Sequence, residues 1–446
     1  MLVLSLRENG IEENFKKAEQ YRDMFDLIEV RIKEAIPRYR LPESMPLYLT
    51  ITDVGVLEKW SWDISPTIVD LPFESSSESL KRVRELFPNA ILQGSSHLEQ
   101  EASDFEILSR ATLSKGFDSV KIVCHASSLM ASLSLFEFLH NNCSKMRLTC
   151  FPIGEKVQYG RIIAAALGSF CSFCSLPSQP VAPGQLDIET FHTLYGGKEI
   201  SKNTTLYGLI GNPVEKSLSH ITHTRLFRSF GLDAVYVKIP VNIGEAQEVV
   251  ERLLSLGFRG LSVTTPLKRY WGNTPINTLR RRKNNIDFLN SDGKALVDAV
   301  KIKGPFKSAL ILGAGAVALS VAQELSTLGI QLFFHNRTRE GAERLLKMYD
   351  GKVVDLEKIQ QVDVVVNATS SPDFFIPLRG LGVKLVCEFI YPETSALLRL
   401  AQKLNISVVT GTELWVRQAA KQFHFWCGFD ENRVVKYLQE SLSCPV

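Results

Sequence analysis

The chain lacks the features that mark membrane, secreted and nucleic-acid-binding proteins. None of its apolar runs approaches the ~18 residues that span a bilayer, so we expect no membrane segment. The N-terminus shows neither a basic start nor a cleavage site, so we expect no secretory signal. The net charge is only +3, and the one basic tract, residues 280–283, is typical of a solvated loop edge. We therefore expect a cytoplasmic protein with neither a membrane nor a nucleic-acid partner.

Cysteine usage also indicates no metal site. The eight cysteines are scattered, and the C-x-x-C of Cys171 and Cys174 has no second pair or nearby histidine to complete a zinc set. Buried thiols in a reducing compartment are the better interpretation, and we expect no metal. What the chain does have is length. Its 446 residues, 45% hydrophobic and 22% charged, suit a globular protein of two or three domains.

The stretch from 308 to 338 predicts a dinucleotide-binding unit. A strand, a glycine turn, a helix and a second strand are expected at residues 309–312, 313–318, 318–328 and 330–334. In such a unit Gly313 and Gly315 let the backbone approach a pyrophosphate at the helix N-terminus. An ordinary βα turn is the alternative, because Ala316 and Val317 interrupt a full G-x-G-x-x-G.

The end of the second strand selects the cofactor. An NAD site usually has Asp or Glu there to hold the ribose 2′-hydroxyl. This chain instead has Asn336, Arg337 and Thr338, and a cation beside a hydroxyl suits a 2′-phosphate. The sequence therefore favours NADP as the cofactor.

Eight short apolar runs occupy the first half of the chain, most of them separated by polar, helix-like segments. They lie at residues 2–6, 27–32, 47–51, 67–71, 90–92, 120–124, 147–151 and 170–176. Strands that alternate with helices predict a parallel sheet, and eight such units predict a closed (β/α)8 barrel of the α/β class. Because the span is short for that fold, we expect several helices to be trimmed.

Two side chains near the carboxyl ends of these strands, where barrel chemistry collects, would support imine chemistry. Lys121 lies inside the apolar run 120–124, where desolvation favours the uncharged amine that attacks a ketone. His97 ends the preceding strand and suits a proton shuttle beside the imine. Taken alone, a strand lysine is usually an edge or snorkelling residue, and a lone histidine is usually structural.

Further residues of the first half form an ordered set with these two. Glu29 and Arg31 lie two apart, on one face of a strand. Arg161 opens a helix-like run, and the loop 182–185 reads A-P-G-Q. In order and spacing, the whole first half resembles the type I 3-dehydroquinate dehydratases.

This resemblance implies that Lys121 forms a Schiff base with 3-dehydroquinate and that His97 is the general acid/base in a syn-elimination of water. The implied substrate contacts are Glu29 and Arg31 to hydroxyls, Arg161 to the carboxylate, and Gln185 from the closing loop. Departures from the family pattern concern substrate positioning. The arginine and glutamate of the third strand and its following loop are replaced by Thr52 and Val56, and two serines by Gly160 and Val181.

Hydroxyls, a lysine and an aspartate mark the strand ends of the second half. Ser217 and Ser219 lie in a segment expected to be extended, where both hydroxyls can hold one carboxylate, although a serine-rich turn is equally possible. Thr264 and Lys268 follow an apolar strand and are expected in the crevice at its carboxyl end. Lys268 can pair there with Asp292 and be oriented toward a hydroxyl whose proton leaves as hydride leaves the carbon. A plain salt bridge is the alternative.

Beyond the dinucleotide unit, strands are expected at 362–366 and 384–389, the latter followed by Tyr391. Gly411 begins a helix that carries Gln418 and is expected to return to the substrate-binding lobe, so that the cleft lies between two lobes. This half resembles shikimate dehydrogenase over essentially its full length. The matching patterns are S-L-S, V-T-x-P-x-K, I-N-T, N-x-D-G, G-A-G, N-R-T, N-A-T-S and G-x-E-L-x-x-x-Q.

The second resemblance implies that Lys268 and Asp292 are the catalytic pair. The implied substrate ligands are Ser217, Ser219, Thr264, Asn277, Tyr391 and Gln418. The cofactor residues expected from this resemblance and from the dinucleotide unit are Gly313, Gly315, Ala316, Asn336, Arg337, Thr338 and Gly411. Departures that would affect affinity are Lys216 for histidine, His220 for proline, Ser262 for asparagine, and Ala316-Val317 for Gly-Ala.

The two resemblances support each other, because dehydration of 3-dehydroquinate makes 3-dehydroshikimate, the ketone that the second enzyme reduces to shikimate. The order resembles the bifunctional enzymes of plants and some bacteria, whose partners are these small molecules. We predict a barrel at 1–195, a linker at 196–204, a substrate lobe at 205–300 completed by 411–446, and a Rossmann NADP-binding lobe at 301–410. Two alternatives stay open: a weakened or non-catalytic barrel, and an NAD-linked quinate/shikimate dehydrogenase.

Overall fold

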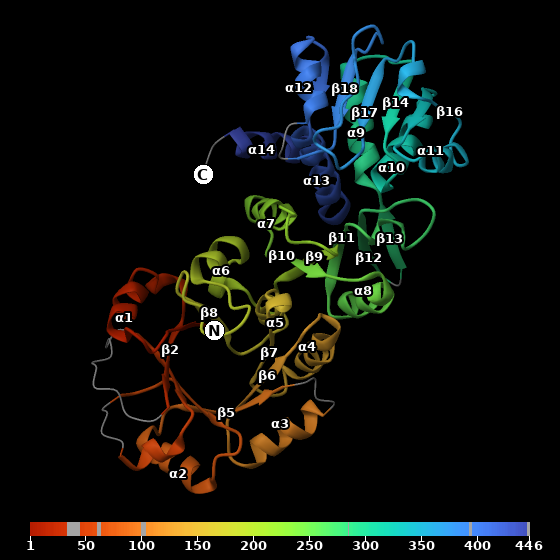
Figure 1. The fold of residues 1–446 in the computed structure, drawn as a ribbon. Coiled ribbons are helices and arrows are strands. Elements are labelled where there is room, and N and C mark those ends of the chain that lie inside the picture. The colour runs from red at the N-terminus through yellow and green to blue at the C-terminus, as the bar shows by residue number, and fades with distance from the viewer. Residues whose placement is uncertain (34–44, 60–63, 100–103, 284, 392–394, 444–446) are drawn as a thin grey trace. The chain divides into compact units, whose positions relative to one another are not determined.

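The computed structural model describes residues 1–33, 45–59, 64–99, 104–283, 285–391 and 395–443. The chain forms two compact units (Figure 1). The first contains residues 1–209 and 213–259, and the second contains residues 210–212 and 260–446.

The first unit begins with eight parallel strands. They are β1 Leu2–Ser5, β2 Leu27–Ile32, β3 Leu47–Ile51, β4 Ile68–Pro72, β5 Ile91–Leu98, β6 Ser119–His125, β7 Leu148–Ile153 and β8 Ser172–Ser175. Neighbours follow the chain order from β1 to β7, and β8 lies beside β1. At the remaining seam the Phe170 amide donates to the Leu148 carbonyl at 2.6 Å. The predicted (β/α)8 barrel is therefore confirmed as a nearly closed one.

Helices lie on the outside of this barrel (Figure 1). They are α1 Ile11–Glu19, α2 Ser77–Leu86, α3 Phe105–Ser114, α4 Met130–Asn142, α5 Gly160–Ala166 and α6 Ile188–Tyr195. Helix α2 shows how they form: the Ser76 hydroxyl caps its start, and Leu80 and Val83 are its buried residues. Between β3 and β4 the described residues form the short 3-10 helix η2, Val54–Lys59, in place of a full α-helix. This agrees with the expectation that some helices of the barrel are shortened.

The rest of the first unit packs on the barrel through ion pairs and carbonyl contacts. It contains most of β9 Thr205–Gly211, with α7 Ser219–Ser229, β10 Ala234–Pro240 and α8 Ala246–Ser255. Arg252 of α8 donates to the Glu137 carboxylate of α4 at 2.7 and 2.9 Å. Arg228 of α7 donates to the carbonyl oxygens of His192 and Thr193 in α6. These contacts explain why residues 213–259 belong to the same compact unit as the barrel.

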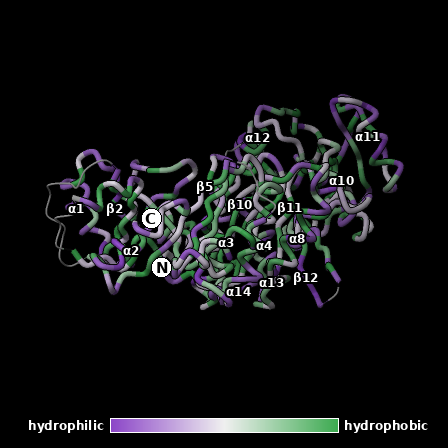
Figure 2. The backbone as a smooth tube through the Cα atoms, turned by 90° about the horizontal axis from the view of Figure 1, so that it is seen from below, coloured by the Kyte–Doolittle hydropathy of each residue, from purple (hydrophilic) through white to green (hydrophobic). Residues whose placement is uncertain are grey.

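The second unit begins with an antiparallel hairpin and a helix. They are β12 Thr278–Arg282, β13 Asn285–Leu289 and α9 Ser291–Lys303. The five-stranded sheet that contains this hairpin has the order β10-β9-β11-β12-β13, with β11 at Phe258–Val263. The end of β12 is coloured hydrophilic in Figure 2, and Arg281 and Arg282 there are exposed. Arg281 and Arg282 thus lie at the solvated edge of a hairpin, as predicted, whereas Arg280 is half-buried and pairs with Asp287.

A six-stranded parallel sheet follows, in the order β16-β15-β14-β17-β18-β19. Its strands are β14 Ser308–Leu312, β15 Gln331–His335, β16 Lys352–Val353, β17 Val364–Asn367, β18 Leu385–Glu388 and β19 Ser407–Val409. Its helices and those after it are α10 Ala316–Ser326, α11 Arg339–Leu346, α12 Ala396–Lys403, α13 Gly411–Cys427 and α14 Glu431–Ser443. This order is that of a dinucleotide-binding sheet, which confirms the predicted Rossmann-like lobe.

The described residues were expected to contain neither a membrane-spanning helix nor a metal site. Within those ranges, no helix combines the length and the apolar character that crossing a membrane requires. No group of three potential metal ligands comes together there. Cys171 and Cys174 are buried free thiols, as their apolar neighbours predicted.

The absence of a side chain at Gly293 lets α9 and α10 approach each other closely. A Cβ at 293 would overlap the Ser320 carbonyl oxygen of α10 and lie 2.7 Å from its hydroxyl. We expect Gly293→Ala to cost about 1–3 kcal/mol through overpacking, measured as a lower urea midpoint of unfolding. Gly244→Ala is the matched control, because its Cβ would meet nothing within 4 Å. Equal midpoints for the two variants would contradict the packing argument.

Candidate active sites

Lys121 lies inside the barrel on β6, where a carboxylate and a phenol hold its ammonium. The side chain is buried, with 4% of the residue exposed. Its Nζ lies 2.8 Å from Asp70 Oδ2 and donates to the Tyr48 hydroxyl at 3.2 Å. The Phe173 ring lies beneath it, 4.6 Å from Nζ to centroid. Three strands, β3, β4 and β6, therefore converge on one nitrogen.

Lys121 is withdrawn from water, as expected, but a carboxylate and a phenol contact its nitrogen in addition to apolar residues. Sequence analysis missed both Asp70 and Tyr48. A signal for Asp70 existed, since a carboxylate inside the apolar run 67–71 is as unusual as a lysine inside 120–124. Tyr48 offered no such signal, because an aromatic residue in an apolar strand is ordinary.

His97 lies on the strand beside Lys121. Strand β5 reaches Leu98, well beyond the predicted 90–92, and pairs in parallel with β6. Ser95 is level with Lys121 and His97 with Val123, so the imidazole lies two residues nearer the carboxyl end of the sheet. Desolvation, and next the positive charge of Lys121, lower the pKa of His97 below its ordinary value of 6.5. The lowered pKa favours the neutral imidazole, which can act as a base.

Glu29 and Arg31 project from one face of β2, as predicted, and form an ion pair. Glu29 is fully buried and accepts from Arg31 Nε at 3.1 Å and from the Thr50 hydroxyl at 2.9 Å. Burial by itself would raise the pKa of Glu29, but the charges of Arg31 and Lys121 outweigh it and lower the pKa to about 2. Both carboxylate and guanidinium are thus charged throughout the neutral range.

Arg161 is buried with an unpaired nitrogen among the described residues, whereas Gln185 is engaged in hydrogen bonds that hold its loop. Arg161 on α5 is 2% exposed, packs 4.9 Å from the Phe151 ring centroid, and has a pKa lowered to about 10 by burial. Its Nε makes no hydrogen bond to any residue that the structure describes. Gln185 instead fastens its own loop, since its Oε1 accepts from the Val181 amide at 2.9 Å. Its Nε2 reaches the Ser5 hydroxyl of β1 at 3.4 Å.

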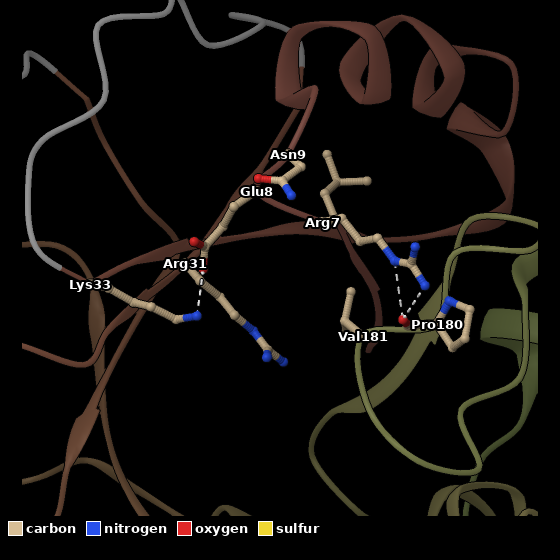
Figure 3. A pocket seen from close by; sticks show the side chains of 8 residues that line it. Arg7, Glu8, Asn9, Arg31, Lys33, Pro180 and Val181 are labelled. Carbon is tan, nitrogen blue, oxygen red and sulfur yellow. Dashed lines mark hydrogen bonds and ion pairs between the residues drawn. The ribbon is translucent and has the colours of Figure 1, made fainter.

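A cavity of about 330 Å³ opens beside Arg31 (Figure 3). It is lined by Leu6, Arg7, Glu8, Asn9, Arg31, Lys33, Pro180 and Val181. Arg7 donates to the Pro180 carbonyl at 3.1 and 3.3 Å, which ties the loop before Val181 to β1. Lys33 pairs with Glu8 at 3.3 Å. Sequence analysis missed Arg7 and Lys33, which bring two more cations to this cavity.

Thr52 and Val56, which replace the family's arginine and glutamate, make contacts within the fold. The Thr52 hydroxyl donates to the Ile32 carbonyl at 3.2 Å, and Val56 is buried in η2. Neither position therefore supplies a charged group to the barrel interior.

In the second unit, Lys268 and Asp292 form the predicted pair. Lys268 lies in the 3-10 helix η6, Leu267–Arg269, after the carboxyl end of β11, and its Nζ is 2.6 Å from Asp292 Oδ2. The two side chains are only 15% and 6% exposed. Asp292 lies in the first turn of α9, where unpaired amides favour a negative charge.

Asn277 holds Asp292 by a hydrogen bond, and Gln422 in turn holds Asn277. Asn277, buried at the start of β12, donates to Asp292 Oδ1 at 2.9 Å and to the Ser291 hydroxyl at 2.8 Å. Gln422 of α13 donates to the Asn277 carbonyl at 3.1 Å and to the Thr278 hydroxyl at 2.8 Å. Sequence analysis missed Gln422, although it lies one helical turn from Gln418 on the same face of α13. These bonds hold α13 against the start of β12.

The other expected substrate ligands of this unit lie on neighbouring elements. Thr264 follows β11 and is half-buried, and Tyr391 stacks on Trp415 of α13 at 4.9 Å between centroids. Gln418 is half-buried on α13. Within the described ranges no hydrogen bond joins these three to the lysine–aspartate pair. A Cβ at Gly411 would overlap the Ile390 carbonyl oxygen, so this glycine is also needed for packing.

Ser217 and Ser219 belong to the first unit and differ from expectation in backbone conformation. The segment is not extended, because Ser219 begins α7. The two hydroxyls nevertheless lie together, with Ser217 Oγ donating to Ser219 Oγ at 3.1 Å. His220 beside them is desolvated and close to Lys238, which lower its pKa to about 4.

The predicted dinucleotide turn has the required backbone geometry. Gly313 has φ +103°, and a Cβ there would lie 3.1 Å from the Ala368 carbonyl oxygen. Gly315 caps α10, which Ala316 begins, and a Cβ on Gly315 would meet nothing within 4 Å. Asn336 donates to the Thr338 carbonyl and hydroxyl, both at 3.0 Å, and Arg337 beside them is exposed. An open glycine turn at a helix start fits a pyrophosphate.

Three family descriptions match the chain. Type I 3-dehydroquinase matches residues 56–202, the shikimate dehydrogenase substrate binding domain matches 209–272, and shikimate / quinate 5-dehydrogenase matches 299–381. Together they match segments of both compact units. The last of them is a family of nicotinamide-dependent enzymes, so the chain uses a nicotinamide cofactor.

The chain is similar to proteins that match most of its length and to shikimate dehydrogenases that match about half of it. The shikimate biosynthesis protein AroDE of Chlamydia pneumoniae is 28% identical over 87% of this chain and 83% of its own. The bifunctional 3-dehydroquinate dehydratase/shikimate dehydrogenase of Arabidopsis thaliana is 27% identical over 82% and 68%. Shikimate dehydrogenase (NADP(+)) of Pyrococcus abyssi is 33% identical over 50% of this chain and 92% of its own. The chain therefore belongs to the shikimate dehydrogenase family and is a fusion in which a type I 3-dehydroquinase precedes the dehydrogenase.

Proposed function

We propose that the two halves work in sequence on one ring acid. The barrel dehydrates 3-dehydroquinate through an imine on Lys121, and the second half reduces 3-dehydroshikimate to shikimate with NADPH at Lys268 and Asp292. The observation that supports this most directly is that the lysine expected to act in each half is withdrawn from water and paired with a carboxylate, Lys121 with Asp70 and Lys268 with Asp292. Paired lysines of this kind occur where an enzyme needs a positioned amine or proton donor.

In the barrel, the amine of Lys121 replaces the ketone oxygen of the substrate, which leaves as water. The neutral imidazole of His97 then takes the proton from the carbon beside the imine and returns it to the departing hydroxyl. Glu29 and Arg31 bind ring hydroxyls, and Gln185 closes its loop through the Val181 amide. Arg161 binds the substrate carboxylate, because its buried Nε is a donor with no described partner.

The cations of the barrel cavity support the same proposal. The third strand has no arginine at Thr52, but Arg7 and Lys33 line the cavity next to Arg31. Positive charge near a carboxylate substrate is thus provided by the segments that follow β1 and β2 instead. A non-catalytic barrel is the second candidate. It is favoured because Thr52 stands where the family has an arginine, and its hydroxyl donates to the Ile32 carbonyl.

In the second half, Lys268 gives a proton to the carbonyl oxygen that becomes the new hydroxyl. Asp292 holds the Lys268 ammonium, and Asn277 holds Asp292. Bound nicotinamide supplies the hydride. The residues that would hold the cofactor are the turn from Gly313 to Ala316, Asn336, Arg337, Thr338 and Gly411. Those that would hold the substrate are Ser217, Ser219, Thr264, Asn277, Tyr391 and Gln418.

We also propose the domain limits stated from the sequence: 1–195, 196–204, 205–300 with 411–446, and 301–410. The start of β9 at Thr205 supports the first boundary of the dehydrogenase. The bonds from Gln422 to Asn277 and Thr278 support the return of the C-terminal helix to the substrate lobe.

Separate lysine variants test whether the two chemistries are independent. We expect Lys121→Ala to lose dehydration and the borohydride-stable substrate adduct while keeping NADPH-dependent reduction. Lys268→Ala should do the reverse, with kcat for reduction about 10²–10⁴-fold lower, because it loses a positioned proton donor. The measurements are the two half-reactions and the intact mass after borohydride. Normal dehydration by Lys121→Ala would exclude the imine.

Arg337 tests the choice of NADP. We expect Arg337→Ala to lower kcat/KM for NADPH about 10–100-fold, as expected for a lost hydrogen bond to a charged group, with little change for NADH. Arg339→Ala is the neighbouring control, since Arg339 pairs with Glu343 at 3.0 Å. A wild-type preference for NADH, or equal losses in both variants, would contradict the assignment.

A further inference from the structure

Asp70 makes the closest charged contact to the reactive nitrogen of the barrel. Its Oδ2 lies 2.8 Å from Lys121 Nζ, and the two residues are 1% and 4% exposed. Water is therefore almost absent from both members of the pair. A cation in such a place is stable only with an opposite charge in contact, because the cost of desolvation exceeds what a distant charge returns.

Other charged and titratable groups surround this pair, but they are engaged elsewhere or farther from Nζ. Strand by strand, they are Glu29 and Arg31 of β2, Tyr48 of β3, His97 of β5, and Cys171 just before β8. Glu29 is bonded by Arg31 through two nitrogens, at 3.1 and 3.3 Å. Among the described residues, Asp70 is thus the carboxylate that forms an ion pair with Lys121.

The proposed reaction leaves a positive charge on this nitrogen. An ammonium and a ketone give a protonated imine and one water, so the cation present on Lys121 before the reaction is present after it. When His97 takes the carbon-bound proton, the imine becomes a neutral enamine and His97 becomes a cation. When that proton leaves with the substrate hydroxyl as water, the protonated imine returns. Hydrolysis of this imine restores the ammonium.

We propose that Asp70 is the counterion of the protonated imine on Lys121 and that it keeps the imine nitrogen protonated both before the carbon-bound proton is removed and after water has left. This inference rests on the proposed imine chemistry and adds a catalytic residue to it. A neutral imine withdraws electrons weakly, whereas a protonated one makes the neighbouring C–H acidic enough for His97. In this account Asp70 stays ionised and neither gives nor takes a proton.

The surroundings of Asp70 suit a fixed charge. The Tyr48 hydroxyl accepts from Lys121 Nζ at 3.2 Å and donates to Gln93 Oε1, which holds the phenol in place. Asp70 Oδ1 is buried and makes no hydrogen bond to a residue that the structure describes. That oxygen is free to accept a hydrogen bond from the hydroxyl of the carbinolamine that precedes the imine.

The test compares Asp70→Asn with wild type in full-length protein, by the pH dependence of dehydration and by borohydride trapping. Without the carboxylate, the buried imine loses its proton at lower pH. We expect the active range of Asp70→Asn to move about 1–3 pH units toward acid, the effect of an opposite charge in contact. At pH 7.5 we expect at least a tenfold loss of turnover and of trapped adduct.

Three controls separate this role from a structural one. Asp118→Asn removes a carboxylate that pairs with Arg84 at the opposite end of the same sheet, and should leave the profile unchanged. Reduction of 3-dehydroshikimate in every variant reports that the second unit is folded, and circular dichroism reports the barrel.

The outcomes are distinguishable. Absence of an adduct in wild type would overturn the imine itself, and with it this inference. An adduct in wild type with an unshifted Asp70→Asn profile would overturn the counterion alone, as would a uniform loss at every pH. A shift toward alkaline pH would show that Asp70 instead removes a proton from Lys121. If Asp70→Asn does not fold, Asp70→Ala with added formate replaces it, and failure of formate to restore turnover in folded protein would contradict the inference.

Discussion

The structure depends on one arrangement that occurs in each half: a lysine withdrawn from water and held by a carboxylate. Lys121 lies 2.8 Å from Asp70 in the barrel, and Lys268 lies 2.6 Å from Asp292 in the second unit. Burial of a lone ammonium is costly, so each carboxylate fixes both the position and the charge of its lysine. In the proposed mechanism the barrel uses this nitrogen to bond carbon, and the dehydrogenase uses it to give a proton to oxygen.

The two folds build this arrangement differently. In the barrel, the pair comes from parallel strands, so Asp70 and Lys121 meet across the interior although 51 residues separate them. In the second unit, the pair comes from the segment after β11 and from the first turn of α9, and Asn277 and Gln422 support it from β12 and α13. The barrel pair is thus held by strand register, and the second pair is held by side-chain hydrogen bonds.

The parts that sequence analysis predicted well are those in which hydrophobicity follows the backbone. The eight apolar runs correspond to β1–β8, and the glycine turn before Ala316 corresponds to the start of α10. Polar residues that face the interior of the barrel do not follow this rule, so the apolar run 90–92 covers only the start of β5, which continues through His97 to Leu98. Asp70, Tyr48 and Gln422 were missed because each acts through partners distant in sequence, which periodicity does not reveal. Ser219 was placed in an extended segment because spacing alone does not distinguish a strand from the start of a helix.

In the proposed function, one chain converts a single ring acid in two consecutive steps. The most direct measurement supplies purified full-length protein with 3-dehydroquinate and NADPH and follows NADPH oxidation while identifying the product by mass spectrometry. We expect one shikimate to be formed for each NADPH consumed. Unchanged 3-dehydroquinate without NADPH oxidation, in a preparation that reduces added 3-dehydroshikimate, would contradict it.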